Sequence, residues 1–324
     1  VSAVLAETED RVREGSSGVA RVWPMGFSPL DTYLGGGLRA GELTVLGGPQ
    51  GLGKTTFALQ VARNVAAAGG SVLFLTFEHD AATMFERLVA LEAGEYAHDE
   101  GITLRNVREA LASTDETPGG LSARLGTERG GAAAVAAIAE YGDRLFVVSA
   151  QTRDTSTDSI RELVLGLAKD EPPVVVVDYL QKIPDGNGHD AESERITRVV
   201  QALKDLALEA AVPVLAISAS EREGIAPGAR MRSHHLRGTS AVAYEADVIL
   251  VMNDKYDVVA REHIVFGSKN AERYHDWVVF TIEKNRSGLA RVDVEFRKRL
   301  EQGRLDPDGQ SVAERLVDER VHGA

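Results

Sequence analysis

The chain of 324 residues contains no cysteine. It therefore forms no disulfide, performs no thiolate chemistry and offers no sulfur ligand to zinc. Any catalytic or metal-binding site in this protein depends on oxygen and nitrogen donors.

Long hydrophobic runs are also missing. No stretch approaches the roughly 18 uninterrupted apolar residues that a membrane-spanning helix needs. The first residues (VSAVLAETEDRVREG) carry acidic side chains where a signal peptide has a basic start and a long apolar run. We therefore expect a cytoplasmic protein without a membrane partner.

Basic residues are outnumbered, since 36 lysines and arginines face 49 aspartates and glutamates, for a formal net charge of −13. This balance argues against a protein that coats nucleic acid over its whole surface. A local basic channel stays compatible with it, because the local field governs contact.

Short apolar runs alternate with segments of helical periodicity such as 55–69 and 196–210. The runs are rich in valine, isoleucine, leucine and phenylalanine, and they are apolar throughout rather than alternating. Strands of this kind are buried on both faces, which is typical of a parallel sheet between helices. The sequence predicts one α/β domain whose strands lie at 43–47, 72–77, 145–149, 174–180, 212–218, 247–252 and 278–282.

Both ends of the chain are predicted to be additions to this domain. Residues 3–13 predict a short helix within an N-terminal arm over 1–15. The domain itself extends over 16–300. A tail follows over 301–324, in which SVAERLVDERV (311–321) predicts a last amphipathic helix. Three segments predict insertions or loops, namely a helical excursion at 112–131 and two loops that each follow a core strand, at 183–193 and 221–235.

The stretch GPQGLGKT (48–55) matches the phosphate-loop pattern G-x-x-x-x-G-K-[ST] between a predicted strand and a predicted helix. Its glycines allow close backbone approaches, and successive N–H groups at a helix N-terminus form a nest for anions. Lys54 supplies a charge for the β and γ phosphates of ATP, and Thr55 offers a hydroxyl to Mg²⁺. The predicted nucleotide contacts are Gly48, Pro49, Gln50, Gly51, Leu52, Gly53, Lys54, Thr55 and Thr56.

Two carboxylates end neighbouring predicted strands. Asp178 closes the run VVVVD, where burial calls for a compensating cation such as Mg²⁺. Glu78 ends VLFLTFE, on the strand after the phosphate-loop helix, and is a candidate base for an attacking water. Simpler roles stay open, because Asp178 can be a turn or cap residue and Glu78 can mark where a strand turns polar.

Several stretches together resemble a known family. They are 26–62 (GFSPLDTYLGGGLRAGELTVLGGPQGLGKTTFALQVA), 72–80 (VLFLTFEHD), 174–182 (VVVVDYLQK) and 283–288 (EKNRSG). The combination resembles the C-terminal ATPase domain of DnaB-type replicative helicases, in the RecA-like group that also includes RadA and KaiC. The resemblance implies a RecA-like P-loop NTPase fold, a mainly parallel twisted sheet flanked by helices, with a C-terminal β-hairpin.

The same resemblance implies roles for residues of the nucleotide site. Glu78 would be the catalytic glutamate, and Thr55 and Asp178 would organise Mg²⁺. Gln181 follows Asp178 as in the family's DYLQ and is included among the nucleotide contacts.

Lys284 and Arg286 precede a predicted turn at Ser287-Gly288. Taken alone, two cations there equally suit a solvated sheet edge. In the family, such residues reach the ATP site of the neighbouring subunit and stabilise charge on the γ-phosphate. The resemblance therefore implies a homo-oligomeric ring, a hexamer, in which both side chains act in trans.

The loops at 183–193 and 221–235 would face the central hole of such a ring. A solvated loop without a ligand stays open for the second segment, whereas the acidic first segment does not suit phosphates. The side chains predicted to contact single-stranded DNA are Arg222, Arg230 and Arg232.

Three features depart from the family pattern. The family's N-terminal helical domain has no counterpart in this sequence, where only the arm precedes the ATPase domain. Ala219 stands where the family has a glutamine that senses the γ-phosphate, and Ala243-Tyr244 replaces a Glu-Gln pair. Because an alanine side chain forms no hydrogen bond, the sequence predicts an altered relay from ATP to DNA.

The leading hypothesis is an ATP- and Mg²⁺-dependent ring-forming ATPase that acts on single-stranded DNA, a candidate DNA helicase. The alternative is an ATP-switched assembly or regulatory protein, similar in logic to KaiC, whose ring recruits a protein partner without unwinding DNA. A protein that holds nucleotide only as a structural ligand is disfavoured, because Lys54, Glu78, Asp178 and Arg286 are all present.

Overall fold

The computed structural model describes residues 1–14, 21–168, 172–184, 191–220, 229–265 and 271–318. Its strands are β1 (Val22–Trp23), β2 (Leu38–Arg39), β3 (Leu43–Gly47), β4 (Val72–Thr76), β5 (Leu145–Ser149), β6 (Val174–Asp178), β7 (Val214–Ile217), β8 (Val248–Asp254), β9 (Trp277–Asn285), β10 (Val292–Arg299), β11 (Arg304–Leu305) and β12 (Gln310–Ser311). Its helices are α1 (Ser2–Arg13), α2 (Ser28–Tyr33), α3 (Lys54–Ala67), α4 (Ala81–Ala97), α5 (Leu104–Ala112), α6 (Gly120–Leu125), α7 (Gly131–Tyr141), α8 (Thr157–Leu167), α9 (Glu192–Ala210), α10 (Thr239–Glu245), α11 (Lys255–Val258) and α12 (Arg261–Val265).

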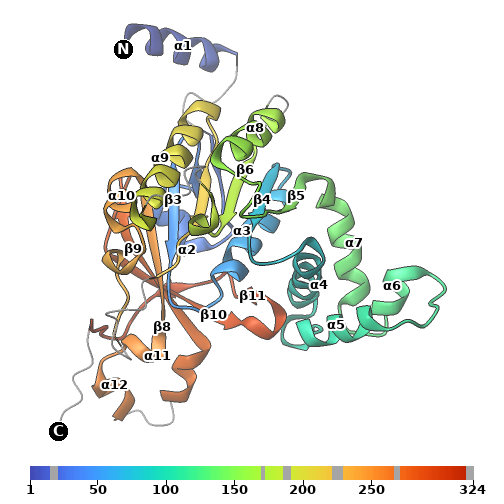
Figure 1. Cartoon of the computed structure of the whole chain (residues 1–324). Coiled ribbons are helices and arrows are strands. Elements are labelled where there is room, and N and C mark those ends of the chain that lie inside the picture. Colours follow the sequence, from blue (N-terminus) through green and yellow to red (C-terminus); the bar gives the residue numbers. More distant parts are fainter. Residues whose placement is uncertain (15–20, 169–171, 185–190, 221–228, 266–270, 319–324) are drawn as a thin grey trace.

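A ten-stranded sheet in the order β11-β10-β9-β8-β3-β7-β6-β4-β5, with β12 beside β10, forms the centre of the molecule (Figure 1). The six strands from β8 to β5 run parallel. From β8 onward the sheet continues antiparallel through the hairpin β9–β10. The predicted α/β fold with a mainly parallel sheet and a C-terminal hairpin is therefore confirmed.

Alternating valines explain why the central strands are apolar throughout. In β6, Val174 and Val176 belong to one buried cluster and Val175 and Val177 to the other, because successive side chains point to opposite faces. On the first face, Phe57 of α3 packs against the sheet, with ring centroids 4.8 Å from Phe280 of β9. Helices α8 and α9 supply apolar side chains to the second face.

The strand predicted at 145–149 differs from the expectation of burial on both faces. It is the edge strand β5, which pairs only with β4 on the sheet path, and Phe146 is 40% exposed. An edge position leaves one side of a strand open to solvent, which the apolar run alone does not reveal.

The C-terminal tail lies against its own domain in an extended form. The described part, up to residue 318, does not contain the helix predicted over 311–321. The backbone groups pair with neighbours instead: β12 pairs with β10, the Leu316 backbone forms a bridge with Val259, and the amide of Val317 donates to the carbonyl of Val258. These partners replace the hydrogen bonds that a helix would form within itself.

The predicted helix at the start of the chain is α1, which Figure 1 shows apart from the sheet. Its apolar side chains Val4, Leu5 and Val12 are exposed. The predicted excursion at 112–131 is helical in part, through α6, and packs with α4, α5 and α7 around a small apolar cluster of its own. Among the described residues, no helix is both long and apolar enough to span a bilayer. The division into arm, domain and tail stays a prediction.

Candidate functional site

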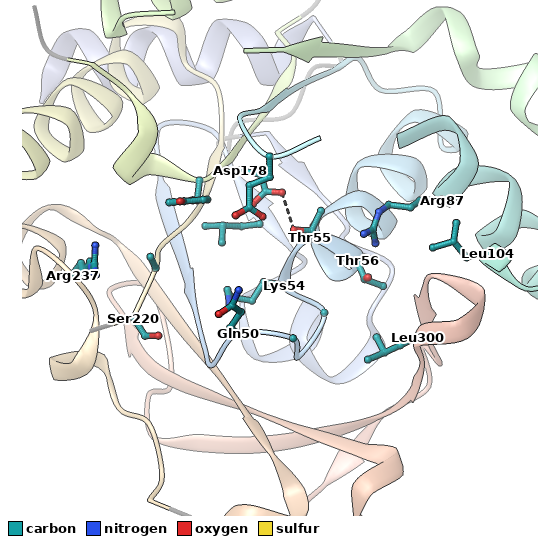
Figure 2. Close-up of a pocket in the computed structure, with 16 residues that line it drawn as sticks. Gln50, Lys54, Thr55, Thr56, Arg87, Leu104, Asp178, Ser220, Arg237 and Leu300 are labelled. Atoms are coloured by element: carbon teal, nitrogen blue, oxygen red, sulfur yellow. Dashed lines mark hydrogen bonds between the residues drawn. The ribbon is translucent and has the colours of Figure 1, made fainter. Parts of the chain in front are cut away.

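A cavity of about 710 Å³ opens at the carboxyl edge of the parallel strands (Figure 2). Strands β3, β7, β6 and β4 end there side by side, in the position where sheets of this kind bind ligands. The phosphate loop forms one wall, through Gln50, Gly51, Gly53, Lys54, Thr55 and Thr56.

The loop turns from β3 into α3 by means of its glycines. Gly53, the residue before α3, has a φ of 91°, and a Cβ there would lie 2.8 Å from Leu300 Cδ2. A Cβ on Gly48 would lie 2.9 Å from Met252 Cβ. Both positions therefore require glycine. The turn points the first free N–H groups of α3 toward the cavity, where an anion finds unpaired donors and a positive helix end.

Three predicted nucleotide contacts shape the loop without lining the cavity. Leu52 packs into the core, where it is 6% exposed. Gly48 and Pro49 offer their carbonyls to the ammonium of Lys54, at 2.8 and 2.9 Å. Lys54 is thereby held at the cavity wall. Burial lowers its pKa, and the negative charges of Asp178 and Glu78 act in the opposite direction.

Asp178 ends β6 at the floor of the cavity and is 1% exposed. The hydroxyl of Thr55 donates a 2.8 Å hydrogen bond to its Oδ2 atom (Figure 2). Burial raises the pKa of Asp178 to about 6, and the nearby charge of Glu78 adds to this shift, while the Thr55 hydrogen bond and Lys54 oppose it. The carboxylate is thus poorly solvated and suits a cation as its partner.

Glu78 lies beside Asp178 because the two strand ends are joined. The amide of Phe77 donates to the carbonyl of Asp178 at 2.7 Å, and Thr76 Oγ1 accepts the amide of Glu78 at 3.3 Å. Glu78 lines the cavity. The structure therefore brings together Lys54, Thr55, Glu78 and Asp178, as the sequence predicts.

Arg87 is a cavity residue that the sequence reasoning missed. It comes from α4, and Figure 2 shows it on the side of the cavity near Thr56 and Leu104. Its Nε atom is buried and has no hydrogen-bond partner among the described residues. Burial lowers its pKa, and nearby Arg108 adds to this effect. A single arginine within the apolar stretch TMFERLVALEA was the available signal.

Two leucines from distant segments form the apolar end of the same cavity. Leu104 begins α5, and Leu300 follows β10. A second cavity of about 480 Å³ shares both side chains. Apolar walls beside a phosphate loop suit the base of a nucleotide.

Gln181 is buried and does not line the cavity. Its amide nitrogen donates to Ser218 Oγ at 2.9 Å, and its amide oxygen accepts the backbone N–H of Ala219 at 2.9 Å. The glutamine therefore joins the segment after β6 to the end of β7. This contact uses the backbone of residue 219, so it does not depend on the side chain that alanine lacks.

Lys284 and Arg286 lie at the opposite edge of the sheet. Lys284 Nζ donates to the carbonyl of Ala243 at 2.6 Å, and Arg286 pairs with Asp247 at 3.1 Å. Asp247 in turn binds Leu43, the first residue of β3. The phosphate loop follows the other end of this strand, so neither cation lines the cavity of its own chain.

The predicted DNA contacts lie in different settings. Arg230 is 4% exposed and forms an ion pair with Asp293, so its guanidinium is not offered to a ligand in this structure. Arg232 is half-buried and pairs with Glu283 at 3.0 Å and with Asp318. Arg222 lies outside the described residues. The basic pattern of the sequence could not distinguish an arginine that balances an interior carboxylate from one that faces solvent.

The donors at the cavity fit a nucleotide-bound Mg²⁺. A hydroxyl and a carboxylate are the hard oxygen ligands that this ion takes, and the phosphates and water supply the remainder. The described residues contain no cluster of three or more histidine, cysteine, aspartate or glutamate side chains that could hold a metal alone. The site thus suits a metal that arrives with its substrate.

The family model of the DnaB-like helicase C-terminal domain matches residues 23–303. The chain belongs to this family. The replicative DNA helicase DnaB of Treponema pallidum is 27% identical over 268 residues, which cover 82% of this chain and 54% of that protein. DnaC of Bacillus subtilis is 26% identical over 265 residues, 79% of this chain and 53% of that one. The chain thus spans about half the length of these relatives.

Two solved structures share the fold. A DnaB-like replicative helicase studied for its interactions with primase matches with a TM-score of 0.71 at 21% identity, over 93% of this chain and 66% of that one. An isolated ATPase domain gives a TM-score of 0.70 at 20% identity, over 94% of this chain and 97% of that chain. The DNA repair protein RadA of Mycolicibacterium smegmatis is 45% identical over a shorter stretch of 83 residues, 26% of this chain and 17% of that protein.

Proposed function

We propose that this DnaB-like chain is an ATP- and Mg²⁺-dependent ATPase that forms a homo-oligomeric ring, a hexamer, and acts on single-stranded DNA in the cytoplasm as a helicase-type motor. Family membership supports the class of activity. One geometric observation carries the proposal further: a complete phosphate site at one edge of the sheet, and two cations at the other.

Within one chain, the residues at the cavity divide the work of hydrolysis. The loop amides and Lys54 bind the phosphates. Thr55 and Asp178 would hold Mg²⁺, which supplies charge neutralisation to the phosphates when it is bound. Glu78, beside Asp178, orients the attacking water and accepts its proton.

Lys284 and Arg286 complete the site of a neighbouring copy. Strand β3 has five residues at about 3.3 Å each, so roughly 16 Å separate its first residue, near Arg286, from the phosphate loop at its end. The cations therefore cannot serve their own cavity without a large rearrangement. Supplied in trans, they stabilise charge on the transferring phosphoryl group, and an arginine of this kind raises turnover by about 10³–10⁵.

Contact with DNA is assigned to the segments that follow β6 and β7, where Arg222 stays a prediction. Arg232 is the other predicted contact that is partly accessible, although acidic partners hold it. Phosphates of single-stranded DNA would compete with those partners for its guanidinium.

The test is steady-state ATP hydrolysis with and without single-stranded DNA, with the Lys54→Ala chain as the blank and particle mass measured in parallel. We expect a ring, hydrolysis that Lys54→Ala abolishes, and stimulation by DNA. Arg286→Ala should form the ring but hydrolyse ATP poorly. Hydrolysis indifferent to DNA would favour the ATP-switched assembly protein instead, and a fully active monomer would refute action in trans.

A further inference from the structure

Asp247 is a buried carboxylate at the amino edge of the sheet, and it joins three elements. It is 5% exposed and immediately precedes β8. Its Oδ1 atom accepts Arg286 Nη1 from the hairpin at 3.1 Å. Its Oδ2 atom accepts Lys204 Nζ from α9 and the amide of Leu43 from β3, both at 2.8 Å.

The main chain strengthens the same arrangement. The amide of Asp247 donates to the carbonyl of Leu43 at 2.9 Å, and the amide of Arg286 donates to the carbonyl of Asp247 at 3.0 Å. The second terminal nitrogen of Arg286 donates to the carbonyl of Tyr244. Arg286 is thus fixed at its backbone and at both ends of its guanidinium.

This fixation leaves Arg286 able to act on something outside the chain. Its side chain is 47% exposed. A guanidinium has five N–H donors in a rigid fork, and the two contacts within the chain leave others for an external acceptor. A half-exposed arginine held this firmly is oriented before its ligand arrives.

We propose that Asp247 is a positioning residue that orients Arg286 toward the ATP site of the neighbouring copy. Through Leu43 it ties this orientation to β3, the strand that carries the chain's own phosphate loop. The inference rests on the proposed function, because it requires Arg286 to act in trans. Orientation fixed in advance removes a cost that each turnover would otherwise carry.

A purely structural role for Asp247 makes a different kinetic prediction. If Asp247 only anchors β3, its loss loosens the phosphate loop of the same chain, weakens ATP binding and raises KM. If it positions Arg286, its loss lowers kcat at the neighbouring site and leaves KM unchanged, because the loop that binds ATP is intact.

The experiment uses full-length chains carrying Asp247→Asn. Asparagine keeps an oxygen for the Leu43 amide but loses the charge that holds Arg286. We expect kcat to fall about 10- to 100-fold with KM for ATP within about twofold of wild type. Lys204→Met is the matched control, because it removes the other cation on Asp247, and we expect it to keep kcat within about twofold. An unchanged kcat for Asp247→Asn, or a raised KM, overturns the inference.

Mixed rings identify which site is impaired. The Lys54→Ala chain has no working cavity but retains Arg286, so an excess of it supplies intact neighbours to the Asp247→Asn chain. We expect the rate per Asp247→Asn chain to approach that of wild type mixed with Lys54→Ala at the same ratio. A rate that stays low in the mixture locates the defect in the chain's own site and overturns the inference.

The two proposals fail separately. If Arg286→Ala is as active as wild type, action in trans is wrong and the positioning role with it. If Arg286→Ala is inactive while Asp247→Asn behaves as wild type, only the positioning role is wrong. Should Asp247→Asn not fold, Asp247→Glu keeps the charge and displaces the carboxylate by one methylene. A lowered kcat that mixing restores supports the inference, and an unchanged kcat overturns it.

Discussion

Thr55 Oγ1 donates a hydrogen bond of 2.8 Å to Asp178 Oδ2, and this bond joins the first turn of α3 to the end of β6. A hydroxyl from the phosphate loop thus partly satisfies a carboxylate that burial would otherwise penalise. Both oxygens proposed as Mg²⁺ ligands are already side by side in the free chain.

The first prediction concerns the free energy of unfolding of the chain without metal. Burial raises the pKa of Asp178 from 3.8 to about 6, so the folded chain binds this proton more tightly than the unfolded chain. Ionisation therefore destabilises the fold increasingly as pH rises through this window. Asp178→Asn should raise the free energy of unfolding by about 2–3 kcal/mol near pH 7 and by progressively less as pH falls below 6 toward 3.8.

Denaturant unfolding at a series of pH values, with a chelator present, measures this effect. Asp205→Asn is the matched control, because Asp205 is an exposed aspartate on α9 and should show no such trend. A stability gain from Asp178→Asn that does not change with pH would show that ionisation is not its cause.

The second prediction concerns Arg87, whose buried Nε atom has no partner among the described residues. Arg87→Met should stabilise the nucleotide-free chain, because it removes a poorly solvated cation. The same change should weaken ATP binding about 5- to 10-fold, because the cavity loses a positive charge that attracts the phosphates. These opposite signs separate a ligand-binding arginine from a structural one.

Thermal unfolding without nucleotide and displacement of a fluorescent ATP analogue measure the two effects of Arg87→Met. Arg161→Met is the control, since Arg161 is an exposed arginine of α8 paired with Glu209 outside the cavity. If Arg87→Met lowers both stability and affinity, Arg87 supports the fold and does not bind nucleotide.

The parts of the site that the sequence predicts are those encoded by contiguous patterns. The phosphate loop and the run VVVVD each combine a strand signal with a functional residue a few positions away, so strand order alone brings them together. Glu78 was found for the same reason. Parallel topology places all strand ends of this kind at one edge, which made the prediction possible.

The parts that were missed depend on contacts between distant segments. Leu104 and Leu300 meet at the cavity although they come from distant parts of the chain, and no periodicity encodes that meeting. Arg230 looked like a loop cation because its partner Asp293 lies on another strand. The tail pattern fits a helix in isolation, yet its backbone hydrogen bonds go to residues such as Val258.

The third prediction separates the arginines expected to contact DNA. Arg230→Met leaves Asp293 without its buried partner and should cost about 3–5 kcal/mol of stability. Arg222→Ala should leave stability unchanged but weaken binding to single-stranded DNA, with a shallower dependence on salt concentration. Unfolding curves and fluorescence anisotropy at several salt concentrations test both. If Arg222→Ala binds DNA with the affinity and salt dependence of the wild type, the prediction for Arg222 is wrong.

The last prediction concerns the link between ATP and DNA through Gln181. This side chain contacts Ser218 and the backbone of Ala219, at the end of the strand that leads into 221–228, while Arg195 holds the carbonyl of Gln181 at 2.8 Å. The segment carrying Asp178 is thereby tied to the segment predicted to contact DNA, without the family's glutamine at position 219. Gln181→Leu should keep basal hydrolysis within about twofold and lose most stimulation by DNA, because the leucine forms neither hydrogen bond. Ser218→Ala, which removes one of the two contacts, should lose less. If Gln181→Leu hydrolyses ATP with undiminished DNA stimulation, the signal passes elsewhere.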